Sequence, residues 1–100
     1  MLLIRTLVAI IVAIAMVQTP TAVTIQGFAF RPAELSIGVG TTVQWTNQDG
    51  APHQVESDDG TLAGPVMGTG ATFSFTFGTP GRITYHCAIH PSMNGVVVVQ

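Results

Sequence analysis

Apolar and polar residues alternate along most of the chain after residue 22, which is the period-2 pattern of half-buried β-strands. Alternating segments occur at 23–25, 35–39, 43–45, 73–77 and 83–87. Turn signals rich in glycine and proline, such as Thr79-Pro80-Gly81, separate them. The last apolar run, Val96–Val99, is continuous and β-branched, which is typical of a strand at the centre of a sheet.

About six or seven short strands, with no helical periodicity after residue 22, predict an all-β fold, either a sandwich or a barrel. The phase of the alternation slips at Gln26-Gly27, so a bulge or bend is expected before Phe30. The stretch from Ser57 to Gly70 has the least regular pattern, and it is expected to form a long surface connection.

The first 22 residues have a different pattern. An apolar run, Leu7–Val17, follows the single cation Arg5. This run is short for a membrane-spanning helix and typical of the core of a signal peptide. Residues 1–22 are therefore interpreted as a short hydrophobic helix serving as an export signal, with an uncleaved membrane anchor as the alternative. Both interpretations place residues 23–100 in the periplasm or another extracytoplasmic compartment.

Composition narrows the possible functions. A chain of 100 residues has room for one domain, and 47% apolar residues can build its core. The net charge is −2 and lysine is absent, so the chain lacks the basic patch that nucleic-acid binding requires. Cys87 is the only cysteine, which excludes an intramolecular disulfide. No Ser/His/Asp set or pair of carboxylates stands in a catalytic arrangement.

The candidate chemistry is concentrated near the C-terminus. Cys87, His90 and Met93 stand at C-x2-H-x2-M spacing, and His53 lies upstream behind its own strand. Two imidazoles, a thiolate and a thioether form the ligand set of a copper electron-transfer site, with His2Cys in a plane and a weak axial Met. Structural zinc favours four strong Cys or His ligands, and iron–sulfur clusters favour several thiolates. The ligand set therefore predicts copper.

Strand phase separates the histidines. Cys87 has the inward phase of its strand and His86 the outward phase, so His86 is interpreted as a surface residue. The loop 88–92 can then return His90 toward Cys87. His53 has to arrive from a second loop, which is feasible because the loops of a β-sandwich cluster at its two ends.

Several segments resemble the cupredoxins, the blue-copper family of plastocyanins, amicyanins and pseudoazurins. The resemblance covers residues 23–99, and the short ligand loop is most similar to that of amicyanin. The motifs that carry it around the site are Pro52-His53-Gln54-Val55, Tyr85-His86-Cys87 and His90-Pro91-Ser92-Met93-Asn94-Gly95. Gln54 departs from the asparagine that is common in the family, where a hydrogen bond steadies the ligand loop.

The resemblance implies an antiparallel Greek-key β-sandwich, a blue copper domain at 23–100, with copper near one end. It implies His53 and His90 as the imidazole ligands, Cys87 as the thiolate ligand and Met93 as the axial thioether. In such proteins electrons pass through the second histidine, which reaches the surface within an apolar patch.

The function expected from these features is the shuttling of single electrons by type 1 copper between redox partners outside the cytoplasm. A donor and an acceptor protein would dock near His90, on a patch that includes Ile89, Pro91 and Pro65, and the carrier is expected to be a monomer. Protein ligands fill the coordination positions, so an enzyme is not expected. The alternative is a copper carrier or storage protein without an electron-transfer role, and the absence of Met-rich or His-rich tracts weighs against it.

Overall fold

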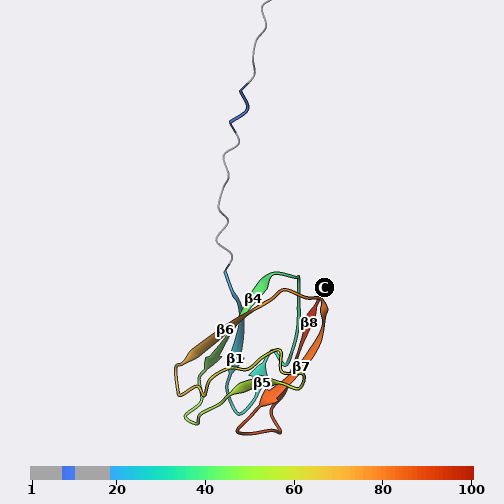
Figure 1. Cartoon of the computed structure of the whole chain (residues 1–100). Helices are drawn as coiled ribbons and strands as arrows, with labels where there is room; N and C mark the ends of the chain where they lie inside the picture. Colours follow the sequence, from blue (N-terminus) through green and yellow to red (C-terminus); the bar gives the residue numbers. More distant parts are fainter. Residues whose placement is uncertain (1–7, 11–18) are drawn as a thin grey trace, which may run out of the picture.

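The computed structural model describes residues 8–10 and 19–100 (Figure 1). These residues form strands and connections without a helix, which confirms the all-β prediction. The strands are β1 (Thr21–Ile25), β2 (Phe30–Arg31), β3 (Glu34–Ile37), β4 (Thr41–Asn47), β5 (Val55–Ser57), β6 (Thr72–Phe77), β7 (Gly81–Cys87) and β8 (Asn94–Val99).

The predicted leader helix falls mostly on residues outside the described ranges. Within those ranges, no helix is long and apolar enough to cross a membrane. Strand β1 begins at Thr21, slightly before the predicted start of the domain at residue 23.

The strands form two four-stranded sheets, ordered β2-β1-β4-β6 and β3-β8-β7-β5 (Figure 1). The prediction of a sandwich is confirmed, but its sheets are mixed and not wholly antiparallel: β1 runs parallel to β4, and β3 runs parallel to β8. The chain crosses into the second sheet as β3 before it returns as β4. Such a long crossover allows two strands of one sheet to run in the same direction.

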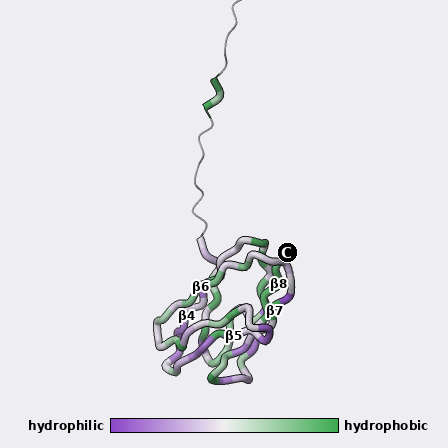
Figure 2. The backbone as a smooth tube through the Cα atoms, in the orientation of Figure 1, coloured by the Kyte–Doolittle hydropathy of each residue, from purple (hydrophilic) through white to green (hydrophobic). Residues whose placement is uncertain are grey.

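Strand β8 lies between β3 and β7, as the continuous valine run predicted. Figure 2 shows the hydrophobic character of β8. Val97 and Val99 are buried, while Val96 and Val98 are partly buried. Gly95 is required in this strand because any side chain there would overlap the ring of Tyr85.

Aromatic side chains from both sheets fill the core. Trp45 of β4 is fully buried, and its ring stacks on Phe73 of β6 at a centroid distance of 5.7 Å. Its Nε1–H donates a hydrogen bond to the Tyr85 hydroxyl of β7 at 3.3 Å. This bond joins the two sheets and satisfies the indole donor inside the core.

The predicted bend at Gln26-Gly27 separates β1 from β2. Gly27 and Phe28 both adopt positive φ, 64° and 55°, which is a rare conformation for phenylalanine. Phe30 beyond the bend is buried, whereas Phe28 is 51% exposed. Phe28 therefore belongs to the surface at this bend and not to the core.

The connection between β5 and β6 is long, as predicted, but it is packed and not purely a surface loop. Its Leu62 and Met67 side chains are buried. Isolated bridges pair Met67 with His53 and Ala63 with Glu56. The connection is thus tied to the segment that carries His53.

Candidate metal centre

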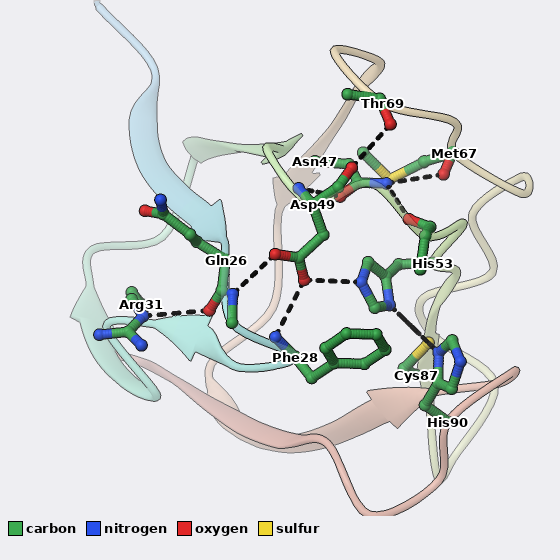
Figure 3. Close-up of polar contacts among 12 residues, drawn as sticks. Gln26, Phe28, Arg31, Asn47, Asp49, His53, Met67, Thr69, Cys87 and His90 are labelled. Atoms are coloured by element: carbon green, nitrogen blue, oxygen red, sulfur yellow. Dashed lines mark hydrogen bonds and ion pairs between the residues drawn. The ribbon is translucent and has the colours of Figure 1, made fainter.

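Two loops at one end of the sandwich bring three predicted ligands together (Figure 3). His53 lies between β4 and β5, Cys87 ends β7, and His90 lies in the loop before β8. Cys87 Sγ is 3.6 Å from His53 Nδ1 and 3.8 Å from His90 Nδ1, and the two Nδ1 atoms are 3.3 Å apart.

These distances suit a transition-metal ion. A triangle with sides of 3.3, 3.6 and 3.8 Å has a circumscribed circle of radius about 2.1 Å, close to ordinary imidazole–metal and thiolate–metal bond lengths of ~2.0–2.3 Å. Within the described residues, these are the His, Cys, Asp or Glu side chains whose ligand atoms gather closely enough to hold an ion. One thiolate with two imidazoles matches the soft, planar donor set of copper.

The three side chains differ in burial. His53 and Cys87 are completely buried, whereas His90 is partly exposed. Burial shields the sulfur of Cys87 from solvent oxidants. His90 is therefore the group through which the centre meets the surface.

The loop that follows Cys87 closes on itself. The Met93 N–H donates to the His90 carbonyl at 3.0 Å, and the Cys87 N–H donates to the Met93 carbonyl at 3.1 Å. Met93 is 4% exposed, so its side chain is buried at this end of the sandwich. The short C-x2-H-x2-M spacing thus forms one tight turn beside β7, and the role of Met93 as fourth ligand stays a prediction.

Gln54 holds the two ligand segments together. Its backbone N–H points at Cys87 Sγ at 3.4 Å, and its carbonyl accepts the Ala88 N–H at 2.9 Å. Its side-chain Nε2 donates to the Gly64 carbonyl at 2.9 Å. The longer glutamine side chain therefore makes an anchoring hydrogen bond at the position where asparagine is common.

Asn47, at the end of β4, anchors the loop that carries His53. Its buried amide Nδ2 donates to the carbonyls of Ala51 and Met67, both at 2.9 Å. The backbone of His53 in turn exchanges two hydrogen bonds with Met67, at 3.0 and 2.7 Å. The loop therefore places the His53 ring with little freedom.

Two residues at the centre escaped the sequence reasoning. The Asp49 carboxylate lies 2.9 Å from His53 Nε2 and also accepts the N–H groups of Gly27 and Phe28 (Figure 3). These backbone hydrogen bonds, Phe28 first, and the nearby His53 lower the pKa of Asp49, although burial opposes the shift. The carboxylate four residues before His53 was the available signal.

The Phe28 ring is the second missed feature. Its centroid lies 5.2 Å from that of His53 and 5.1 Å from that of His90, with edge-to-face angles of 83° and 85°. The two imidazole rings are 5.0 Å apart. Three aromatic rings thus pack together beside Cys87.

His86 lies outside the centre, as its strand phase predicted. Its ring is held between carboxylates on the outer face of β7: Nδ1 lies 2.7 Å from Asp58 and Nε2 lies 3.2 Å from Glu56. The structure therefore separates the two histidines on either side of Cys87 in the sequence: His86 faces outward, whereas His90 lies at the metal centre.

A β-sandwich with a His2Cys group between two loops at one end defines a copper protein of the cupredoxin class. Residues 17–100 match the family described as "Copper binding proteins, plastocyanin/azurin family". The chain belongs to this family.

Known proteins similar to this chain include amicyanins. Amicyanin-alpha of Methylorubrum extorquens is 36% identical over 85 residues, which cover 80% of this chain and 71% of that protein. Amicyanin of Paracoccus denitrificans is 40% identical over 76 residues, covering 71% of this chain but only 58% of the relative. The solved Cu(I) form of a mutant amicyanin matches with a TM-score of 0.79 and 36% identity, over 86% of this chain and 87% of that one.

Proposed function

We propose that this protein is a type 1 copper electron carrier that shuttles single electrons between redox partners outside the cytoplasm. The observation that carries the proposal is the convergence of Cys87 Sγ with the Nδ1 atoms of His53 and His90 at 3.3–3.8 Å. These three groups would hold the copper ion, and the Met93 thioether would be its fourth ligand.

Bound copper supplies the one-electron couple, and the chain supplies a fixed set of donors. The thiolate and thioether favour the reduced ion, whereas imidazole tolerates both oxidation states. The donor atoms of Cys87 and His53 sit on buried, hydrogen-bonded segments. A site held this firmly changes little when the charge of the ion changes, which keeps the reorganisation on electron transfer small.

Electrons enter and leave through His90 in this proposal. Its ring is partly exposed, and the neighbouring Ile89 and Pro91 are exposed as well. The exposed Phe28 ring contacts His90 from another loop. A small apolar surface of this kind suits weak, transient docking of a donor and an acceptor protein.

Protein groups would fill the coordination positions of the ion, so substrate has no open position there and we propose a carrier and not an enzyme. We also propose that the carrier acts as a monomer. Residues 1–22 act as an export signal or anchor, on the evidence of their apolar run, and residues 23–100 form the copper domain. The mass of the exported protein distinguishes a cleaved leader from a retained one.

The alternative function is a copper carrier or storage protein without electron transfer. Rapid-mixing reduction of the Cu(II)-loaded protein, compared with copper loss to a chelator, separates the two functions. We expect reduction in a single one-electron step, with copper retained through many cycles, and a reversible wave in voltammetry. Ready transfer of copper to the chelator without reversible reduction would support storage and contradict electron transfer.

A further inference from the structure

We propose that Asp49 is a positioning residue of the copper centre, which orients His53 and at the same time holds the Phe28 ring against both imidazoles. The inference rests on the proposed function, because it assigns a role toward the copper ligands. It concerns a carboxylate and an aromatic ring that donate nothing to the ion themselves.

The orientation of His53 depends on its contact with Asp49. Its ring is completely buried, and Nε2 faces Asp49 Oδ2 at 2.9 Å. A carboxylate accepts hydrogen bonds, so the proton of the neutral ring is held on Nε2. Nδ1 is then left with a lone pair, and this is the nitrogen that faces Cys87 Sγ.

The same carboxylate stabilises the turn at Gly27-Phe28. Consecutive N–H groups of these residues converge on Asp49, at 2.7 Å to Oδ1 and 2.9 Å to Oδ2. Successive amides at a turn form a concave site for an anionic group. The left-handed conformation of Phe28 is unfavourable for a residue with a side chain, and the two hydrogen bonds to the carboxylate offset this cost.

The carboxylate of Asp49 also couples this turn to His53. Asp49 Oδ2 receives both the Phe28 N–H and the His53 Nε2, so one oxygen atom connects the ring support to the imidazole. The Phe28 side chain then returns to pack edge-to-face on His53 and His90. A shift of the carboxylate would move the turn, the ring and His53 together.

The backbone of Asp49 is itself held by hydrogen bonds. Its backbone N–H donates to the side-chain oxygen of Asn47 at 2.9 Å, and its carbonyl accepts the Thr69 hydroxyl at 2.7 Å (Figure 3). Its side chain is only 10% exposed. Hydrogen bonds from the end of β4 and from the connection before β6 therefore fix the backbone of Asp49. This fixed backbone in turn fixes the position of the carboxylate and of the groups bonded to it.

Asp49→Asn tests the proposal because an amide has one acceptor oxygen, and its NH2 group would face at least one of the three N–H donors. Asp58→Asn is the matched control, since Asp58 pairs with His86 at 2.7 Å on the outer face of β7. In metal-free protein, we expect Asp49→Asn to shift the NMR resonances of the Gly27 and Phe28 amides and to broaden His53 into mixed tautomers. In copper-loaded protein, we expect the copper affinity, measured by competition with a chelator, to fall about 10–100-fold.

The Asp58→Asn control should leave each of these signals as in the wild type. Equal behaviour of the two variants would overturn the proposal. Asp49→Glu, which retains the carboxylate, should recover the His53 tautomer at least in part, whereas a purely structural disturbance would not be rescued this way.

Phe28→Gly tests the ring independently and stays informative if Asp49→Asn does not fold. Glycine accepts positive φ, so the turn and its hydrogen bonds to Asp49 are retained while the ring is removed. We expect an altered Cu(II) EPR spectrum and faster solvent exchange of the His53 Nε2 proton. An unchanged spectrum and exchange rate would overturn the role of Phe28. If wild-type protein binds no copper, the proposed function fails, but the metal-free tautomer measurement still decides the role of Asp49.

Discussion

The two faces of strand β7 differ in residue type and in surroundings. On the inner face, Tyr85 and Cys87 are buried, and Cys87 meets two imidazoles. On the outer face, Thr84 and His86 bond to the exposed carboxylate of Asp58. The inner face builds the metal centre, whereas the outer face makes a solvated polar network.

The comparison is sharpest between two histidine–carboxylate pairs. His53 and Asp49 lie 2.9 Å apart with side chains 0% and 10% exposed, while His86 and Asp58 lie 2.7 Å apart with side chains 26% and 59% exposed. Distance alone therefore does not distinguish them. Two features distinguish the pair at the metal centre: it is buried, and the second ring nitrogen of His53 faces Cys87 and His90. In contrast, both ring nitrogens of His86 face carboxylates.

The largest expected effect is on copper affinity. His53→Ala removes a proposed copper ligand, so we expect copper affinity to fall by more than the ~10–100-fold that loss of an outer hydrogen-bond partner causes. His86→Ala should bind copper as the wild type does. Competition against a chelator measures both, and comparable losses in the two variants would contradict the distinction between the two histidine–carboxylate pairs.

A second expectation concerns alkaline stability. Burial raises the pKa of Tyr85 from 10.0 to about 12, and the hydrogen bond from Trp45 opposes this only in part. The folded protein therefore keeps the phenol protonated where the unfolded chain has released the proton. The stability that results is complete below pH 10 and is lost as the pH rises from 10 to about 12.

Tyrosinate absorbance and denaturant midpoints across this pH range measure that effect in metal-free protein. Tyr85→Phe is the matched variant, and its stability should fall less steeply over the same range because it has no buried phenol to ionise. A tyrosine that titrates near pH 10 in the folded protein would show that the inner face of β7 is open to water.

The smallest expected effect lies on the outer face of β7. Arg82 and Glu34 approach to 3.6 Å, but their side chains are 61% and 66% exposed. A pair this exposed contributes less than about 1 kcal/mol. Arg82→Gln should therefore change the unfolding free energy by less than that amount, and a larger loss would assign the outer face a structural role that its exposure does not explain.

Strand pattern predicted much of this arrangement because alternation directly encodes which side of a strand a residue faces. The buried Cys87, the outward His86 and the central position of β8 all follow from this rule. The spacing of His90 and Met93 after Cys87 was equally informative, because one short loop carries these residues.

The remainder depends on contacts between distant segments. Phe28 alternates with Phe30 in sequence, but the left-handed turn moves it out of the strand pattern and onto the imidazoles. Asp49 is an ordinary loop carboxylate until the turn at Gly27 folds against it. The parallel pairing of β1 with β4 likewise depends on a crossover through the other sheet, which local periodicity does not encode.

The central claim is that Cys87, held with His53 and His90, binds copper as a thiolate. Titration of the metal-free protein with Cu(II), followed by visible absorption and EPR, tests it most directly. We predict one equivalent of copper, an intense thiolate-to-copper charge-transfer band and a narrow copper hyperfine splitting. The band and the narrow splitting should be lost in Cys87→Ser and retained in His86→Ala. The absence of the band in wild-type protein, or its persistence in Cys87→Ser, would contradict the account.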